Sequence, residues 1–129
     1  MKIEHLAVWV TDLEAVRRFY ETYFGARAGG RYHNPNKNFS SYFLSFESGC
    51  RLELMHRPDV PKEQLDPVRQ RSGWIHVAMS VGSKERVDHL TDLLRAAGHE
   101  IVGEPRTTGD GYYESVVRDP EGNMIEITV

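Results

Sequence analysis

The amino-acid chain repeats itself, and this repeat restricts the folds open to it more than any other feature. Residues 5–10 read HLAVWV, and residues 76–81 read HVAMSV, 71 positions later (76 − 5). Both stretches have the composition of a strand, and each is followed by a helix-start signal. The segments GCRLEL at 49–54 and GNMIEI at 122–127 match in the same way. The repeat predicts two copies of one structural unit.

The first copy is predicted to contain one helix and several strands. Thr11 and Glu14 form a candidate capping box, with Asp12 in the first turn, and Gly25 is the expected stop. Between these signals, apolar residues recur at helical spacing: Leu13, Val16, Phe19, Tyr20, Tyr23 and Phe24. Further strands are expected at residues 26–32, 39–46 and 51–55.

The second copy follows the same plan. Ser83 is the expected helix cap and Gly98 the expected stop. The apolar positions between them are Val87, Leu90, Leu93, Leu94 and Ala97. Strands are expected at residues 100–105, 112–118 and 124–129, with turns at Asp110-Gly111 and at residues 119–122. Each copy therefore reads strand, helix, strand, strand, strand.

These elements predict an α+β fold made of two tandem βαβββ modules. Module one is expected at 1–56 and module two at 74–129, joined by a proline-rich, charged linker at 57–73. Neither half buries much apolar surface alone, so we expect the two sheets to pack or pair into a single domain over residues 1–129.

The composition excludes several classes of function. Apolar residues make up 40% and charged residues 27%, which is typical of a soluble globular protein, and the net charge of −3 does not favour nucleic acid. The single cysteine, Cys50, excludes an internal disulfide and a cysteine-based zinc site. No apolar stretch reaches the roughly 20 residues that span a bilayer, and the N-terminus lacks a signal-peptide pattern. We therefore expect a cytoplasmic protein without a membrane partner.

Four residues at matching positions of the repeat are candidate metal ligands. His5 and His76 begin the first strand of each module, and Glu53 and Glu126 lie in the last strand of each. The separation is 48 residues (53 − 5) in one module and 50 (126 − 76) in the other. A single strand histidine is more often a hydrogen-bonded core residue, and a single strand glutamate is more often solvated. Four of them at matching positions instead form a mixed nitrogen and oxygen ligand set for a divalent cation.

The segments EHLAVWVTDLEAVRRFYETYFG, GWIHVAMSV and DPEGNMIEI carry a resemblance to a known family. With them the whole chain resembles the vicinal oxygen chelate superfamily, also called the glyoxalase/bleomycin resistance/dioxygenase proteins. The resemblance implies two modules whose sheets form a cup around one divalent ion per site. Nickel, cobalt, zinc, manganese and iron all suit such ligands. The matching positions are His5, Glu53, His76 and Glu126, and this full quartet most resembles glyoxalase I, the lactoylglutathione lyase.

The resemblance also implies a reaction. A metal-dependent lyase or isomerase of this type chelates adjacent oxygens of a small substrate and stabilises an enediolate. Glu126 is implied as the base that removes a proton from the neighbouring carbon, and Glu53 as a ligand that shares this role. In glyoxalase I the reaction converts a hemithioacetal of methylglyoxal to a thioester.

Two positions differ from the short bacterial form of glyoxalase I. Trp9 stands where that form has an arginine for the glutathione carboxylate, and Arg57 stands where it has an asparagine. Both differences argue against glutathione. Trp9 shares strand parity with His5 and is expected on the same face, either as an aromatic wall for a different substrate or as core filler. Arg51 shares a face with Glu53, where it either meets an anionic substrate group or is solvated.

Several alternatives stay open at this point. An extradiol dioxygenase or a fosfomycin-type thiol transferase would use two histidines and one glutamate, so the fourth ligand Glu53 disfavours both. An epimerase of acyl-CoA substrates is also open. A non-catalytic drug-binding protein of the bleomycin-resistance type generally lacks the metal ligands. His33 and His56 remain alternative ligands without a repeat partner, and the resemblance further implies a homodimer.

Overall fold

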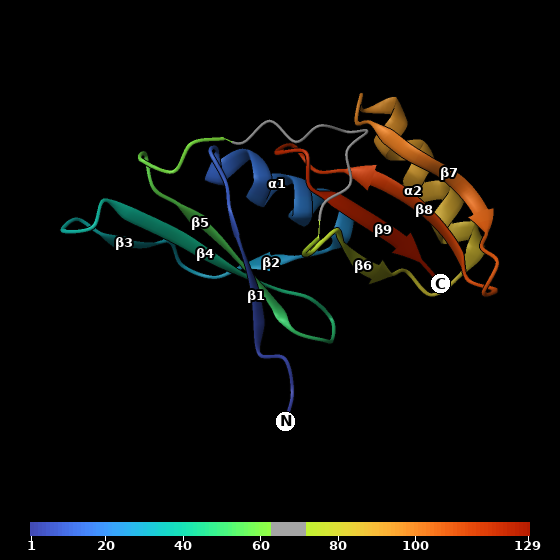
Figure 1. The fold of residues 1–129 in the computed structure, drawn as a ribbon, viewed down its shortest axis with the longest axis horizontal. Helices are drawn as coiled ribbons and strands as arrows, with labels where there is room; N and C mark the ends of the chain where they lie inside the picture. Colours follow the sequence, from blue (N-terminus) through green and yellow to red (C-terminus); the bar gives the residue numbers. More distant parts are fainter. Residues whose placement is uncertain (63–71) are drawn as a thin grey trace. The chain divides into compact units, whose positions relative to one another are not determined.

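The computed structural model describes residues 1–62 and 72–129, and most of the predicted linker at 57–73 lies outside the described residues. The chain divides into two compact units, Met1–Gln64 and Leu65–Val129. Figure 1 shows the first unit in blue to green and the second in yellow to red. Each unit is a helix-covered sheet, and each is described by itself.

The first unit has one mixed sheet and one helix among its described residues. The helix α1 (Leu13–Phe24) follows the first strand directly. The strands are β1 (His5–Trp9), β2 (Arg27–Ala28), β3 (Tyr32–Asn34), β4 (Phe39–Ser45) and β5 (Arg51–His56). The sheet order is β1-β5-β4-β2, with β3 also paired to β4. β1 runs parallel to β5, and the other pairs are antiparallel.

The second unit repeats this arrangement over its described residues. The helix is α2 (Lys84–Ala96), and the strands are β6 (His76–Ser80), β7 (Ile101–Thr107), β8 (Tyr113–Arg118) and β9 (Met124–Thr128). The sheet order is β6-β9-β8-β7, in which β6 runs parallel to β9. The predicted pair of βαβββ modules is therefore confirmed.

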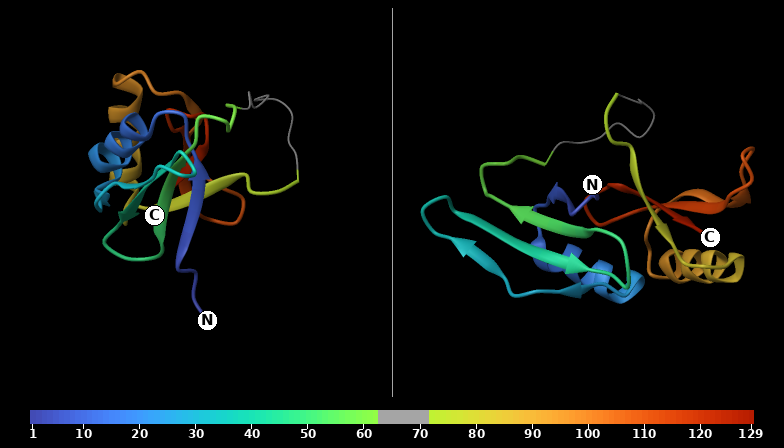
Figure 2. Two further views of the ribbon diagram at one scale, coloured as in Figure 1. Left: turned by 90° about the vertical axis from the view of Figure 1, so that its left-hand side faces the viewer. Right: turned by 90° about the horizontal axis from the view of Figure 1, so that it is seen from below.

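One face of each sheet is covered by the helix of its own unit (Figure 1, Figure 2). Alternate strand residues point to this face, and they form the core with the apolar stripe of the helix. The fully buried apolar side chains are Val16, Leu44 and Leu54 in the first unit, and Val87, Leu94, Val117, Ile125 and Ile127 in the second. The opposite face of each sheet, called the open face below, carries the remaining strand residues.

The start of α1 differs from the predicted capping box at Thr11. Asp12 is the N-cap, with extended backbone, and its carboxylate accepts a hydrogen bond from the Ala15 amide at 2.9 Å. Aspartate caps as well as threonine does, so a neighbouring pair of cap residues leaves the choice to the surrounding packing. Glu14 is thereby placed in the first turn of the helix, where it contacts a strand instead of the cap.

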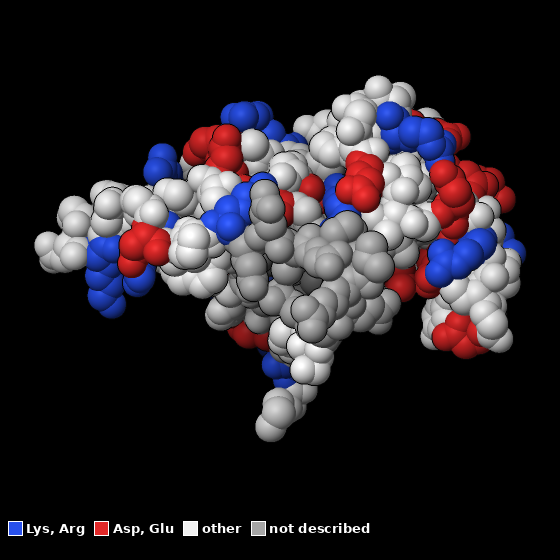
Figure 3. Space-filling model, turned by 45° about the horizontal axis from the view of Figure 1, so that its top comes forward, with Lys and Arg blue, Asp and Glu red and all other residues white. Residues whose placement is uncertain are grey.

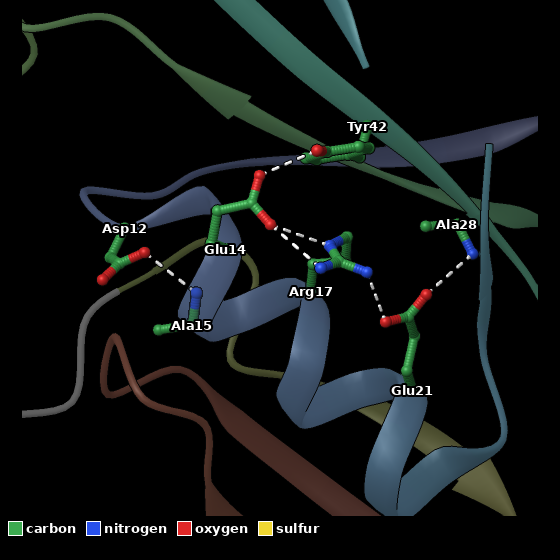
Figure 4. A network of polar contacts seen from close by, with 7 residues as sticks. All are labelled: Asp12, Glu14, Ala15, Arg17, Glu21, Ala28 and Tyr42. Atoms are coloured by element: carbon green, nitrogen blue, oxygen red, sulfur yellow. Dashed lines mark hydrogen bonds and ion pairs between the residues drawn. The ribbon is translucent and has the colours of Figure 1, made fainter. Parts of the chain in front are cut away.

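A tyrosine joins the sheet to the helix in each unit. The Tyr42 hydroxyl donates to Glu14 at 2.7 Å, and Arg17 links Glu14 to the next turn (Figure 4). In the second unit, the Tyr113 hydroxyl donates to Asp88, also at 2.7 Å, but from a different strand position, because Ser115 is the residue that corresponds to Tyr42. The Glu14 pKa is lowered from 4.5, first by the Tyr42 hydrogen bond. Each unit thus has a tyrosine contact between sheet and helix, but the two contacts use different positions of the repeat.

The strand predicted at residues 26–32 is wrong in its extent. β2 covers only Arg27–Ala28, and β3 begins at Tyr32. Gly29 and Gly30 lie between them, and glycine weakens the interior of a strand because it has no side chain to pack and loses more backbone entropy. The predicted helix stops are correct, since Gly25 and Gly98 both have left-handed backbone, with φ of 64° and 85°.

The apolar stripe of α2 is narrower than its sequence suggests. Leu93 is 47% exposed, whereas the polar Thr91 is fully buried. The Thr91 hydroxyl donates to the Val87 carbonyl at 2.7 Å and also bonds to the Ser115 hydroxyl at 2.7 Å. Because the Thr91 and Ser115 hydroxyls are hydrogen-bonded, burying them costs little free energy. The buried face of α2 therefore includes Thr91, whereas Leu93 faces solvent.

The surface of the described residues carries charges of both signs (Figure 3). On the face drawn in Figure 3, basic and acidic side chains lie next to one another. Neither helix in the described part of the chain has the length and apolar character required to span a bilayer.

Candidate metal centre

The parallel pairing of β1 and β5 brings His5 and Glu53 together. Register pairs His5 with Arg51 and Ala7 with Glu53, so His5 and Glu53 are diagonal neighbours on the open face. The His5 Nε2 atom lies 3.9 Å from Glu53 Oε2. The small Ala7 opposite Glu53 leaves room for this carboxylate to lean along the strands toward the histidine.

The parallel pairing of β6 and β9 repeats this geometry. His76 pairs with Met124 and Ala78 with Glu126, so the same diagonal relation holds. His76 Nε2 lies 3.4 Å from Glu126 Oε2. An alanine again stands opposite the glutamate. The two units thus hold their imidazole and carboxylate by the same register, although their sequences differ at most other positions.

Exposure is also alike in the two pairs. The histidine side chains are 39% and 38% exposed, and the glutamate side chains are 15% and 18% exposed. Each carboxylate is therefore sheltered on the sheet, while each imidazole remains within reach of a small molecule. A burial pattern that agrees so closely is expected of a pair that serves one task in both units.

The donor atoms fit a divalent ion. Two ligands at about 2.1 Å from one metal lie about 3–3.5 Å apart, close to the 3.4 and 3.9 Å spacings of the two pairs. Imidazole nitrogen with carboxylate oxygen suits several first-row metals. Over residues 1–62 and 72–129, no group of three or more His, Cys, Asp or Glu side chains is placed to hold an ion. Each unit therefore presents two donors, and the quartet of four stays a prediction.

His5 has a polar neighbour that the sequence prediction did not consider. Glu4 Oε2 lies 2.5 Å from His5 Nδ1. Arg51 donates to the other Glu4 oxygen through Nε at 2.9 Å and also through Nη2. The pKa of Glu4 is lowered by its hydrogen bond to His5 and then by that to Arg51. The adjacency of Glu4 and His5 was visible in the sequence, but the contact with Arg51 depends on strand register.

Glu126 has a different neighbour, which the sequence prediction also missed. Glu114 lies on β8 with the same parity as Val116, the register partner of Glu126, and only 8% of Glu114 is exposed. Burial raises the pKa of Glu114, and the nearby Glu126 carboxylate raises it further. Arg106 Nη2 lies 3.3 Å from Glu114 Oε1 and partly offsets these effects. No signal in one sequence pairs β8 with β9 in this register.

Trp9 lies on the open face of β1, as its parity with His5 predicts, and it is 42% exposed. Its ring meets Phe39 edge-on with centroids 6.1 Å apart, and Phe39 lies 6.1 Å from Tyr32. Trp9, Phe39 and Tyr32 are called the aromatic wall below. The Arg57 guanidinium lies 5.8 Å from the centre of the Trp9 ring. The exposure of Trp9 does not agree with the alternative prediction that this residue is buried in the core.

The remaining candidates are engaged elsewhere. Arg57 forms two hydrogen bonds to Asp59, at 2.7 and 2.6 Å. His56 Nδ1 donates to the Val10 carbonyl at 2.9 Å, and His33 Nδ1 lies 2.9 Å from the Ser40 hydroxyl. His33 and His56 belong to the helix-covered face of the sheet, because they alternate along their strands with the open-face residues. Neither therefore joins the His5–Glu53 pair.

Comparison with known proteins identifies the family. The family model for the glyoxalase/bleomycin resistance protein/dioxygenase superfamily matches residues 2–127. The chain belongs to this superfamily. An uncharacterized protein of Pseudomonas aeruginosa is 32% identical over 98% of this chain and 86% of its own length. A lactoylglutathione lyase of Haemophilus influenzae is 26% identical over 98% of this chain and 90% of its own length.

A solved structure agrees with this assignment. The fold is similar to that of a glyoxalase I mutant from Zea mays, with a TM-score of 0.81 at 23% identity. That likeness covers 98% of this chain, which spans only 44% of the maize chain. This chain has a histidine and a glutamate at equivalent places of both βαβββ modules.

Proposed function

We propose that this superfamily member is a metal-dependent lyase or isomerase of the glyoxalase I type, acting on a small substrate with two adjacent oxygens. The observation that carries the proposal is the pair of matching His–Glu diagonals, with spacings of 3.9 and 3.4 Å. The lactoylglutathione lyase of Haemophilus influenzae, at 26% identity, supports this reaction class over its alternatives.

His5, Glu53, His76 and Glu126 would together hold one divalent ion per site, either nickel, cobalt, zinc, manganese or iron. When bound, such an ion supplies Lewis-acid stabilisation of negative charge on the substrate oxygens. The chain itself provides neutral imidazole donors and ionised carboxylates on sheltered strand positions. These roles account for all four residues that the repeat selects.

Glu126 is proposed as the group that moves the proton. Its carboxylate would take the proton from the carbon that bears the hydroxyl and sulfur and would return it to the adjacent carbonyl carbon, while the hydroxyl proton passes to the former carbonyl oxygen. The substrate is isomerised, so no atom is gained or lost. Glu53 is proposed mainly as a ligand that shares the base role, because Ser41 holds the position in the first unit that Glu114 holds near Glu126 in the second.

The aromatic wall supports a substrate other than a glutathione adduct. Trp9 stands on the same strand face as His5, about 13 Å along β1 at roughly 3.3 Å per residue. A planar or apolar group of a thiol adduct would pack against this wall, with Arg57 beside Trp9 for an anionic group, while Arg51 would meet an anionic group at the other end of the strand, opposite His5. The proposal includes a homodimer that works in the cytoplasm on this small molecule.

Metal stoichiometry tests the proposal. The apo protein is reconstituted with each of the five divalent ions, and bound metal is measured by elemental analysis for wild type, Glu126→Ala and Glu53→Ala. Glu47→Ala is the matched control, because Glu47 is an exposed glutamate outside both pairs. About one ion per site in wild type and in the control, with loss in the other two variants, is expected. No tight binding in wild type would refute the proposed function and favour a drug-binding role.

Turnover on hemithioacetals formed from methylglyoxal and a panel of thiols then tests the reaction. The expected result is metal-dependent isomerisation, with aromatic or apolar thiols preferred over glutathione. A preference for glutathione would contradict the role given to the aromatic wall.

A further inference from the structure

We propose that Glu4 is a positioning residue for His5, one that fixes which imidazole nitrogen is left to face Glu53. The inference about metal binding rests on the proposed function, whereas the inference about the imidazole rests on contacts within the first unit. Glu4 directly precedes β1, and no role has been given to it so far.

The contact between Glu4 and His5 decides the tautomer. Glu4 Oε2 lies 2.5 Å from His5 Nδ1. An ionised carboxylate accepts hydrogen bonds and donates none, so the proton of a neutral imidazole must sit on Nδ1. The lone pair then belongs to Nε2, which is the atom 3.9 Å from Glu53. Metal-binding histidines commonly donate their second nitrogen to a carboxylate in this way.

Glu4 is itself held in place. Arg51 donates to Glu4 Oε1 through Nε at 2.9 Å and through Nη2. The Arg51 guanidinium lies 4.1 Å from the centre of the Phe43 ring, and Phe43 meets the His5 ring edge-on at 5.3 Å. Two strand residues, Arg51 and Phe43, thus confine one carboxylate and one imidazole, because the register places Arg51 directly opposite His5.

Orientation, not stability, is the consequence of these contacts. The Glu4 side chain is 55% exposed and that of Arg51 is 43% exposed, and ion pairs so exposed contribute little to folding free energy. The second unit provides a natural contrast. Ile75 stands before His76 and Met124 stands opposite it, so the apolar Ile75 and Met124 hold the places that Glu4 and Arg51 hold in the first unit.

The tautomer is measured first, on metal-free protein. Long-range proton–nitrogen correlation spectra of the imidazoles are recorded at about pH 8.5, chosen to favour the neutral ring. Wild type, Glu4→Gln, Glu4→Ala and the position-matched control Ile75→Ala are compared. We expect the Nδ1-protonated form of His5 in wild type, a shift toward the Nε2-protonated form in Glu4→Ala, and an intermediate state in Glu4→Gln, whose amide oxygen still accepts. The His76 signals should not change in either Glu4 variant.

Metal affinity is measured next, by competition with a chromophoric chelator. We expect Glu4→Ala to weaken binding of the preferred divalent ion about tenfold or more, and Ile75→Ala to leave it within about twofold. A His5 ring protonated mainly at Nε2 in wild type, or a tautomer insensitive to Glu4→Ala, would overturn the inference. Unchanged affinity in Glu4→Ala would overturn the positioning role for metal. Failure of the wild type to bind any ion would refute the proposed function, and the tautomer spectra would still decide the role of Glu4.

Discussion

The two units share a backbone register but surround their His–Glu pairs with different polar residues. In the first unit, Glu4 and Arg51 lie beside the histidine. In the second unit, Glu114 and Arg106 lie beside the glutamate. Each unit therefore adds one carboxylate and one arginine to its His–Glu pair, beside the histidine in the first unit and beside the glutamate in the second. The register is the part that both copies keep, and the polar surroundings are where the copies differ.

This difference predicts a division of labour. Both glutamates have an apolar register partner, but Glu126 lies close to a second carboxyl group, that of Glu114, where the first unit has Ser41. His5 is preceded by Glu4, whose carboxylate contacts the imidazole, whereas His76 is preceded by the apolar Ile75. On the proposed roles, the first unit orients the nitrogen ligand His5, and the second contains the proposed base, Glu126.

The largest expected effect distinguishes the two glutamates. Glu126→Gln should lower kcat about 10²–10⁴-fold, because the amide oxygen can still occupy a ligand position but cannot take up a proton. Glu53→Gln should have the smaller effect on kcat, since its loss is mainly that of a ligand. Steady-state kinetics at saturating metal provide the measurement. Equal losses would show that both carboxylates share the base role, and a larger loss in Glu53→Gln would reverse the assignment.

The next effect concerns how independent the two units are. Leu54 in β5 and Ile127 in β9 hold equivalent core positions, 73 residues apart (127 − 54), and both are 0% exposed. Leu54→Ala and Ile127→Ala should each lower the free energy of unfolding by about 2–5 kcal/mol, because each leaves a cavity. Calorimetry should show one transition that shifts in both variants. Two transitions, each sensitive to only one variant, would contradict the prediction of a single domain over residues 1–129.

A smaller effect tests the aromatic wall, which only the first unit has. Ser80 occupies the place in β6 that Trp9 occupies in β1. Trp9→Ser should therefore raise KM about tenfold, equal to about 1.4 kcal/mol, with kcat nearly unchanged, because the wall contacts a non-reacting part of the substrate. Leu93→Ser, which removes another exposed apolar side chain, serves as the control. A fall in kcat without a change in KM would assign Trp9 to the reacting centre.

The smallest effect compares the tyrosine contacts. Tyr42→Phe should lower the free energy of unfolding by about 0.5–1 kcal/mol at neutral pH, reduced by solvent screening because the Glu14 side chain is 38% exposed. Tyr113→Phe should cost less, since its contact with Asp88 is exposed. Denaturant unfolding of both variants and wild type measures the difference.

The pH dependence of the Tyr42 effect has a definite sign. The folded-state pKa of Glu14 is lowered from 4.5, so its contribution to stability is present above about pH 4.5 and is lost as the pH falls through the folded-state value. The gap between wild type and Tyr42→Phe should therefore shrink on acidification below pH 4.5. A gap that widens in acid would show that Glu14 is not the partner that matters.

Much of the fold was predictable from the sequence because its signals are local. Alternating strand residues, helical apolar spacing and the stops at Gly25 and Gly98 each depend on a few neighbouring residues. The errors arose where two local signals competed. Asp12 and Thr11 were both competent caps, and the glycine pair inside residues 26–32 divided a strand that composition alone suggested.

For the candidate site, the sequence by itself determined which residues were repeated and, through strand parity, that His5 and Trp9 share one face. Only the tertiary structure decided the diagonal register that brings His5 to Glu53, and the approach of Arg51 to Glu4 and of Glu114 to Glu126. The physical reason is that parity is a property of one strand. Register instead depends on how strands from distant parts of the chain pack together, and shifting it by one residue would move every side chain to the opposite face.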